Sequence, residues 1–299
     1  MSEMHTTTSQ SATAYQTMRS VLGVFKPRIG LVIAITALAG MAVSSGPSLS
    51  AGQTVVLFLA VLLSSASAGA FNQYYEYDID PLMRRTKSRV FASGSMRRGP
   101  KWLLAIGGLL ALSVAAAGWM LNAWVALYVF LGAFFYAVVY TVWLKRRTWL
   151  NIVIGGLAGS WAVLAGAAAV NPDLGAVPLA LAFILFLWTP PHFWSLAIAC
   201  KDDYAAAQIP MLPVVVGESR AARMVFEAAL MLVAASFLPA LLGLGMLYLA
   251  AAALGGGWFV HKAWKLAKAP SRTTAMSCFF ASLIQLSLLL AATMIEAWL

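Results

Sequence analysis

Long apolar runs follow one another along almost the whole chain, with short polar segments between them. Nine runs stand out, at about 29–46, 53–71, 102–120, 123–143, 150–170, 176–198, 222–242, 244–261 and 274–297. About 20 apolar residues in a helix span the hydrocarbon core of a bilayer. The pattern therefore predicts an all-α, polytopic transmembrane bundle of nine helices.

The sequence marks some boundaries of this bundle more clearly than others. Residues 224–260 are almost uninterrupted, and Gly243 and Gly245 are the turn signal between the seventh and eighth helices. Residues 1–20 are rich in Ser, Thr and Gln and contain no apolar run. We expect residues 1–20 to be a disordered cytoplasmic tail and 21–299 to form a single nine-helix domain.

The basic residues predict the orientation of the bundle. All 20 lysines and arginines fall before the first helix or in every second connection, and the other connections contain none. Because Lys and Arg gather in cytoplasmic loops, we expect the amino end to be cytoplasmic and the carboxyl end outside. The expected location is a bacterial cytoplasmic (inner) membrane.

Composition argues against other classes of protein. The chain is 62% hydrophobic and 10% charged, whereas soluble domains are about 45–50% apolar and about 25% charged. The formal net charge of +10 does not indicate nucleic-acid binding, because the charges lie in short breaks between apolar runs and not on one solvated patch.

Acidic residues gather after the second and sixth expected helices. After the second, Asn72, Glu76 and Asp80 have the spacing i, i+4 and i+8, which aligns them on one face of a helix. Pro81 is expected to end that helix at Asp80. We therefore expect three oxygen-bearing side chains to converge at a helix end, without neutralising partners on that face.

Such oxygen ligands suit Mg²⁺, which proteins usually bind through one or two carboxylates together with substrate phosphates. The basic run that follows, Arg84, Arg85, Lys87 and Arg89, is a candidate for holding those phosphates. The alternative is a solvated loop of mixed charge that only sets topology. The spacing alone favours neither interpretation.

A short internal echo favours a site. FKPR at 25–28 precedes the first helix, and LKRRT at 144–148 precedes the fifth. The acidic clusters then follow the second helix and the sixth helix. Parallel placement of this kind indicates two related halves that face one cavity.

At these residues the chain resembles the UbiA superfamily of intramembrane prenyltransferases. The first motif of that superfamily is Asn-Asp-x-x-Asp-x-x-x-Asp, and Asn72, Glu76 and Asp80 match it, although Gln73 replaces its first Asp and Glu76 is a Glu for an Asp. The second motif, Asp-x-x-x-Asp, is incomplete, because Ala199 takes its first position and Asp203 supplies its second acid.

The resemblance is strongest to the protohaem IX farnesyltransferase branch. It is carried between about 26 and 217 by the segments KPRIGLV (26–32), YEYDIDPLMRRT (75–86), YTVWLKRRTWLNIVIGG (140–156) and WTPPHFWSLAIACKDDYAAAQIPMLPVVVG (188–217). The resemblance implies Mg²⁺-dependent transfer of a farnesyl group from farnesyl diphosphate to the 2-vinyl group of haem b. It also implies contact with membrane lipids and a downstream haem A synthase as a partner.

The resemblance also implies roles for individual residues. Catalysis and metal binding are expected of Asn72, Glu76, Asp80 and Asp203. Shelter for an allylic cation is expected from the aromatic faces of Tyr74, Tyr75, Trp188 or Phe193. Substrate binding is expected of Lys26, Arg28, Asp78, Arg84, Arg85, Lys87, Arg89, Tyr140, Lys145, Arg146, His192, Lys201 and Asp202.

His192 carries the haem hypothesis. It follows Pro190 and Pro191, which are expected to open the sixth helix. The functional interpretation is a ligand or contact of the haem iron, and the structural one is a hydrogen-bonded interior histidine.

Two other functions compete with haem farnesylation. One keeps the fold and changes the acceptor to an aromatic or quinone precursor. The other is a membrane transporter of an anionic solute. Transporters bind their solutes near the bilayer midplane, whereas the acidic residues here are expected at the edge of the membrane, which favours an enzyme.

Overall fold

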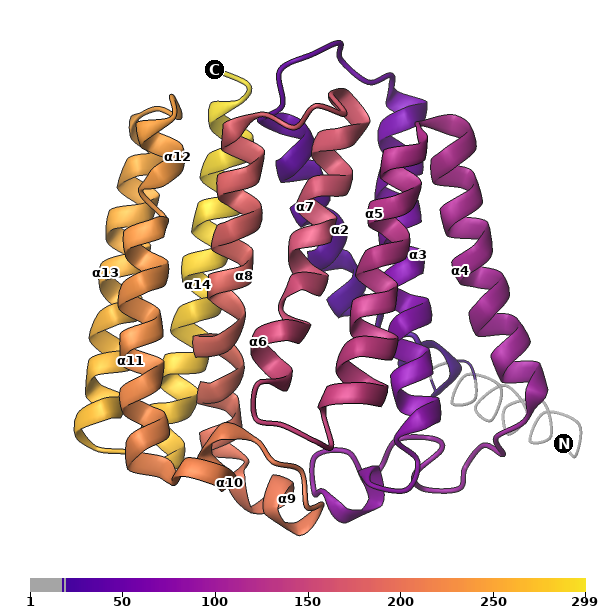
Figure 1. Cartoon of the computed structure of the whole chain (residues 1–299), viewed down its shortest axis with the longest axis vertical. Helices are drawn as coiled ribbons and strands as arrows, with labels where there is room; N and C mark the ends of the chain where they lie inside the picture. Colours follow the sequence, from indigo (N-terminus) through magenta and orange to yellow (C-terminus); the bar gives the residue numbers. More distant parts are fainter. Residues whose placement is uncertain (1–17, 19) are drawn as a thin grey trace, which may run out of the picture.

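The structure is a computed structural model that describes residues 18 and 20–299, and within these residues it contains helices and no strands. The longer helices run nearly parallel to one axis of the molecule (Figure 1). The longer ones are α2 (Pro27–Ala42), α3 (Ala51–Tyr75), α4 (Pro100–Met120), α5 (Ala123–Phe134), α7 (Leu157–Val170), α8 (Ala176–Ala199), α11 (Glu218–Ala235), α13 (Met246–Lys268) and α14 (Arg272–Glu296). The short ones are η1 (Asp80–Leu82), η2 (Phe135–Leu144), α6 (Asn151–Gly155), α9 (Lys201–Ala206), α10 (Leu212–Val216) and α12 (Leu238–Leu241).

Seven helical stretches of the described chain are long and apolar enough to cross a membrane. They are Ala51–Tyr75, Pro100–Met120, Ala123–Leu144, Asn151–Val170, Ala176–Ala199, Glu218–Leu241 and Arg272–Glu296. The runs expected at 29–46 and 244–261 are also helical, as α2 and α13. However, α2 has only 16 residues, and α13, which ends in basic residues, is not among the seven. The integral-membrane architecture is confirmed, whereas the count of nine spans is not.

Most of the expected tail, 1–20, lies outside the described residues. The two described residues within it, Met18 and Ser20, are helical, and the helix continues to Val24 just before α2.

Local sequence signals set several helix ends. Ser50 caps α3 in a capping box with Gln53, and Asn122 accepts a hydrogen bond from the backbone of Val125 at the start of α5. Between α12 and α13, Gly243 adopts a φ of 112°, which other residues rarely reach. The glycine signal between the seventh and eighth predicted helices therefore marks a real turn.

Small residues let α2 and α7 cross at very close range. A β-carbon added at Gly40 would lie 2.2 Å from the carbonyl oxygen of Val163, and one at Gly166 would lie 1.8 Å from that of Ala37. Close backbone approach through small residues is typical of helix packing in membranes. Because α2 also packs on α3 and α14, this crossing joins the two halves of the bundle.

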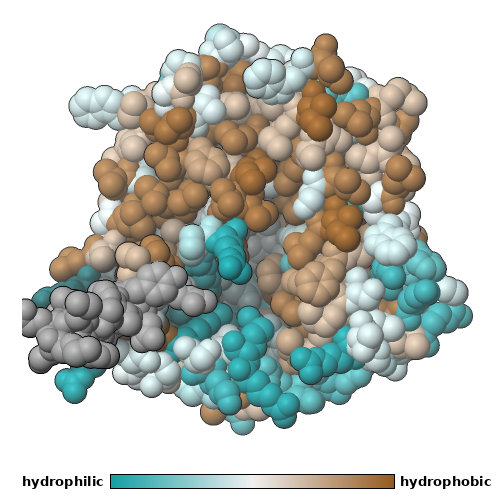
Figure 2. Space-filling view, turned by 180° about the vertical axis from the view of Figure 1, so that it is seen from behind, coloured by the Kyte–Doolittle hydropathy of each residue, from teal (hydrophilic) through white to brown (hydrophobic). Residues whose placement is uncertain are grey.

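The polar connections gather at one end of the molecule. We call this the charged end; it comprises residues 76–101, 145–150 and 200–217, and it lies at the bottom of Figure 1. Figure 2 shows, from behind, an apolar upper surface and hydrophilic side chains toward this end, with a hollow where the two zones meet. The site described below lies at the charged end.

Candidate active site

The end of α3 positions the first three candidate residues. α3 ends at Tyr75, earlier than expected, and Pro81 lies within the one-turn helix η1. The sequence suggested that Pro81 ends this helix at Asp80, and that prediction is wrong. The alignment survives because the backbone N–H of Glu76 donates to the carbonyl of Asn72 (3.0 Å) and that of Asp80 donates to the carbonyl of Glu76 (2.9 Å).

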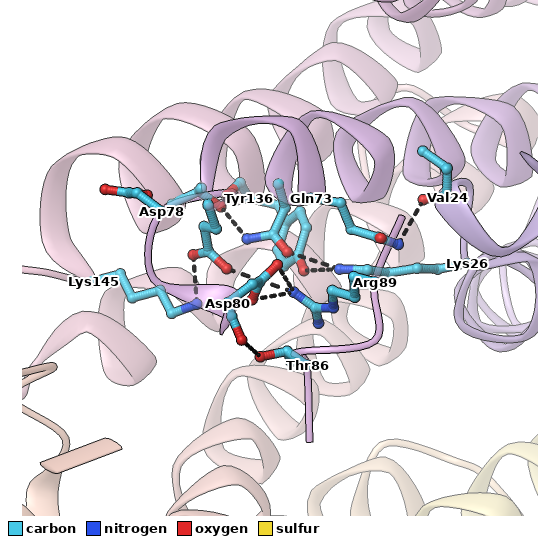
Figure 3. A network of polar contacts seen from close by, with 12 residues as sticks. Val24, Lys26, Gln73, Asp78, Asp80, Thr86, Arg89, Tyr136 and Lys145 are labelled. Atoms are coloured by element: carbon cyan, nitrogen blue, oxygen red, sulfur yellow. Dashed lines mark hydrogen bonds and ion pairs between the residues drawn. The ribbon is translucent and has the colours of Figure 1, made fainter. Parts of the chain in front are cut away.

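The side chains of Asn72, Glu76 and Asp80 are buried, with at most 3% of each residue exposed. The expectation that they lack neutralising partners is wrong. One guanidinium nitrogen of Arg89 donates to both oxygens of Asp80, at 2.8 and 2.9 Å, and lies 3.8 Å from Glu76. Lys145 donates to the other oxygen of Glu76. Figure 3 shows this network.

The side chain of Asn72 has two hydrogen-bond partners, and one of them, Lys26, lies just before α2. The amine of Lys26 donates to Asn72 Oδ1 at 2.8 Å and lies 3.4 Å from the hydroxyl of Tyr136. The amide nitrogen of Asn72 donates to the hydroxyl of Thr141 at 3.2 Å. Lys26 is therefore inside the site, as the resemblance implied.

A π-helix presents the residues from the other side of the site. η2 is a π-helix of 10 residues that continues α5, and its last hydrogen bond runs from the N–H of Lys145 to the carbonyl of Tyr140 (2.9 Å). π-Helical turns are rare and frequently mark functional sites. Here the wide turns bring Tyr136, Tyr140, Thr141 and Lys145 against the end of α3.

Burial and charge act against each other in this network. Burial raises the pKa of Asp80, and the charge of Arg89 opposes that rise. Burial lowers the pKa of Lys145, and the nearby Glu76 carboxylate opposes that fall. The pKa of Lys26 falls to about 7, mainly through burial and then through the charge of Arg89. Two carboxylates face three basic groups, a balance that favours an anionic ligand.

A more exposed ion pair closes one side of the site. Arg146 donates to both oxygens of Asp78, at 2.7 and 2.8 Å, and its guanidinium lies 5.4 Å from the ring of Tyr75. The hydrogen bond from Arg146 lowers the pKa of Asp78. Both side chains remain more than a third exposed. The pair therefore joins the segment after α3 to the end of η2 instead of lying free for substrate.

The segment after α8 meets the segment after α3. The backbone N–H of Arg85 donates to a carboxylate oxygen of Asp203 at 3.3 Å. The Arg85 guanidinium lies near Tyr204, and burial raises the pKa of the Tyr204 hydroxyl. The two acidic segments thus contact each other, as the internal echo indicated. However, no group of three His, Cys, Asp or Glu residues within the described chain is arranged to hold a metal.

The other predicted residues at this end make no hydrogen bond or ion pair with this network in the described part of the chain. Lys201 pairs with Glu218 at 3.1 Å, which links α9 to α11. The remaining four are exposed and make no side-chain hydrogen bond or ion pair within the described part of the chain: Arg28, Arg84, Lys87 and Asp202.

His192 lies away from the acidic cluster, between α8 and α14. Its ring stacks on Trp188 (4.0 Å between centroids) and on Phe279 (4.4 Å), and Nδ1 is 2.7 Å from the Ser282 hydroxyl. α8 remains helical through Pro190 and Pro191, so the expected opening of this helix is not observed.

The aromatic candidates for sheltering a cation have other neighbours. The Arg98 guanidinium lies 4.4 Å from the ring centroid of Tyr74. The indole N–H of Trp188 donates to the carbonyl of Ser282 at 2.9 Å. The ring of Phe193 lies edge-on to that of His192.

Tyr136 and Thr141 are site residues that sequence reasoning missed. Tyr136 stacks on Tyr140, with 5.6 Å between centroids. The spacing of four residues between the two tyrosines was the available signal, because it places both on one helical face. Nothing in the sequence marked Thr141 beyond its place next to Tyr140.

Comparison with known proteins identifies the family. Residues 33–284 match the UbiA prenyltransferase family. The chain belongs to this family. The expected resemblance is therefore confirmed.

Two curated relatives are similar over nearly their whole length. Protoheme IX farnesyltransferase 2 of Paramagnetospirillum magneticum is 56% identical over 279 residues, which cover 93% of this chain and 97% of the relative. Protoheme IX farnesyltransferase 1 of Cenarchaeum symbiosum is 40% identical over 289 residues, which cover 93% and 96%. Within the UbiA family, these similarities favour the haem branch.

Solved structures share the fold at low sequence identity. A digeranylgeranylglyceryl phosphate synthase has a TM-score of 0.77 and 18% identity, covering 94% of this chain and 99% of that one. A UbiA homolog from Archaeoglobus fulgidus, bound to DMAPP and Mg²⁺, has a TM-score of 0.71 and 17% identity, covering 90% and 98%. The helical arrangement is therefore that of UbiA proteins.

Proposed function

We propose that this UbiA family member transfers the farnesyl group of farnesyl diphosphate to the 2-vinyl group of haem b, giving haem O. The observation that carries the proposal is the 56% identity to a protoheme IX farnesyltransferase over 93% of the chain. The surplus of basic groups around two buried carboxylates supports it independently, because a diphosphate is an anion that such a site attracts.

The reaction breaks the bond between the first farnesyl carbon and the diphosphate oxygen, and the electron pair leaves with the diphosphate. The vinyl group then forms a carbon–carbon bond to the allylic cation, and water adds to the resulting haem cation and loses a proton. Arg89 and Lys145 supply positive charge where negative charge develops, which is the main electrostatic contribution a protein makes to such a step. The Lys26 amine is proposed to contact the diphosphate of the bound substrate. Exposed Arg84 and Lys87 are proposed to receive the outer phosphate.

The residues at the end of α3 fit a Mg²⁺ ion. One oxygen of Glu76, Oε2, is buried without a hydrogen-bond partner in the described chain, and Asp80 faces the same guanidinium as Glu76. Asn72 Oδ1 accepts from Lys26 and has a second lone pair. We propose that Glu76 and Asp80 hold the ion with Asn72, and that Asp203 approaches from the second segment. When bound, the ion would neutralise charge on the departing diphosphate.

In the membrane, we propose nine spans, with α2 and α13 added to the seven apolar helices. The amino terminus and the charged end are then cytoplasmic, and Leu299 lies outside. This arrangement leaves every lysine and arginine of the sequence on one side, which the positive-inside rule favours. Membrane lipids cover the apolar surface, and a haem A synthase is the proposed downstream partner.

The haem is proposed to lie with its vinyl group toward Tyr140 and its iron toward His192. The ring nitrogen Nε2 of His192 is the one available for the iron, since Nδ1 is at the Ser282 hydroxyl. Aromatic rings on either side of the imidazole would hold its orientation.

Pigment analysis tests the proposed function. Membranes that contain the wild-type protein, supplied with haem b, farnesyl diphosphate and Mg²⁺, should yield a haem whose mass has increased by one farnesyl group and one hydroxyl group. Membranes with Asp80→Ala should yield haem b alone. Farnesylation of a quinone precursor with unchanged haem would show that the acceptor is not haem. Transport of a solute without any covalent product would show that the protein is a transporter and not a transferase.

A further inference from the structure

Gln73 lies next to the metal-site candidates but points away from them. It occupies the position at which the family motif has its first Asp, and it is buried, with 5% of the residue exposed. Its amide nitrogen donates to two backbone carbonyls, those of Gly23 (3.0 Å) and Val24 (3.1 Å). Figure 3 shows Gln73 directed toward Val24. These bonds require a donor, which a carboxylate at this position would not provide.

The segment that Gln73 holds leads directly to Lys26. The carbonyl of Gly23 also accepts from the backbone N–H of Lys26 at 3.4 Å. Val24 is fully buried in an apolar cluster with Ala70 and Phe91. Two kinds of contact, polar and apolar, thus fix the chain before α2 against the side of α3.

Lys26 needs such support because its backbone is strained. Its φ of 47° and ψ of 52° lie in the left-handed region, which is unfavourable for a residue with a side chain and persists where surrounding structure enforces it. Pro27 follows it and restricts it further. The strain has a function in the structure: it turns the Lys26 side chain into the site, where the amine meets Asn72 Oδ1 at 2.8 Å.

α3 is also shaped to receive the Lys26 side chain. A β-carbon added at Gly69 would lie 3.3 Å from the δ-carbon of Lys26 and 3.6 Å from its β-carbon. Gly69, Asn72 and Gln73 lie within about one turn of α3, so that one short stretch of helix contacts the stem, the amine and the backbone approach of Lys26.

We propose that Gln73 is a positioning residue that holds residues 23–26 in place and thereby sets the Lys26 amine in the active site. The family motif has a candidate metal ligand at this position. In this chain the Gln73 amide instead supports the segment that carries a basic group. This inference rests on the proposed function, in which the Lys26 amine contacts the diphosphate. It makes Gln73 a determinant of substrate binding rather than of the chemical step.

The decisive variant is Gln73→Glu, which keeps the length of the side chain and removes its two donor hydrogens. We expect the KM for farnesyl diphosphate to rise about tenfold or more, with kcat within about twofold of wild type. Lys26→Met should cause a similar rise, and the double variant should be no worse than either single variant, because both changes remove the same contact. The matched control is Gln53→Glu at the exposed start of α3, which should leave KM unchanged.

A second readout requires no substrate. Hydrogen exchange of the 21–30 segment should be faster in Gln73→Glu than in wild type, and calorimetric binding of inorganic diphosphate with Mg²⁺ should be weaker. If the wild-type protein does not farnesylate haem, the proposed function fails, yet faster exchange together with weaker diphosphate binding would still support the positioning role.

Three results would overturn the proposal. The first is unchanged exchange and KM in Gln73→Glu. The second is additive losses in the double variant. The third is tighter Mg²⁺ binding with higher activity in Gln73→Glu, which would make residue 73 a metal ligand. Gln73→Met, which is neutral and of similar length, replaces Gln73→Glu with the same expectations if the latter does not accumulate in membranes.

Discussion

A single guanidinium nitrogen of Arg89 donates to both carboxylate oxygens of Asp80, 2.8 and 2.9 Å away, although both groups lie at the end of an otherwise apolar bundle. The same nitrogen is 3.8 Å from Glu76. Arg89 thus places one positive charge beside two buried carboxylates. We expect both the stability of the site and its chemistry to depend on this charge.

Replacing Arg89 by Met should leave Asp80 and Glu76 without that charge. Breaking a buried ion pair costs about 3–5 kcal/mol, so we expect a lower unfolding temperature and a fall in turnover of at least about 100-fold. Arg89→Lys should recover part of both, since a cation returns without the planar geometry. Thermal unfolding in detergent and haem farnesylation measure the two effects. Wild-type turnover in Arg89→Met would remove the network from the mechanism.

The two aspartates of the same loop should respond differently. Asp78→Asn removes a partly exposed pair with Arg146, and such pairs contribute about 0–1 kcal/mol, so the unfolding temperature should change little. Asp80→Asn alters a fully buried carboxylate and should abolish turnover while the protein still inserts. The comparison is made on membrane fractions with equal protein content. Equal losses in the two variants would contradict a special role for Asp80.

Removal of divalent metal should stop the reaction. With a chelator present, we expect no haem product from the wild-type protein, and added Mg²⁺ should restore it, because the diphosphate would otherwise leave with uncompensated charge. Asn72→Ala should raise the Mg²⁺ concentration needed for half-maximal rate. Full turnover in chelator would exclude the proposed metal role of the α3 end.

His192 offers a test that separates packing from iron binding. His192→Ala should lower the unfolding temperature, because it empties a buried stack between Trp188 and Phe279. His192→Phe refills the stack and should restore stability, but the Soret change on titration with haem should remain smaller than in wild type. If Phe restores haem binding as well, His192 has a packing role alone.

Close packing of α2 on α7 should make Gly166 intolerant of any side chain. Gly166→Ala would place a methyl group within 1.8 Å of a carbonyl oxygen, so we expect poor accumulation or a markedly lower unfolding temperature. Gly107→Ala on α4, where no atom lies within 4 Å of the added carbon, is the control and should behave as wild type. Similar stability of the two variants would contradict the close crossing.

The sequence predicted the helices well because the length of an apolar run can be read from consecutive residues. The run expected at 176–198 corresponds to α8 at Ala176–Ala199, and the spacing of Asn72, Glu76 and Asp80 correctly indicated that they converge. Their partners were not predictable in the same way. Lys145 is 69 residues from Glu76, and nothing local specifies that pairing. The loss of one acid at Gln73 was visible in sequence, but the carbonyls it binds were not.

The π-helix η2 also has consequences for how relatives of this protein are compared. Its hydrogen bonds span five residues instead of four, so the chain from Phe135 to Leu144 holds more residues per turn than an α-helix does. If the same residues formed a regular α-helix, Lys145 would turn about 100° away from Glu76. A relative in which this helix is regular would therefore carry the equivalent lysine one position earlier, and an alignment without a gap at this point would pair the wrong residues.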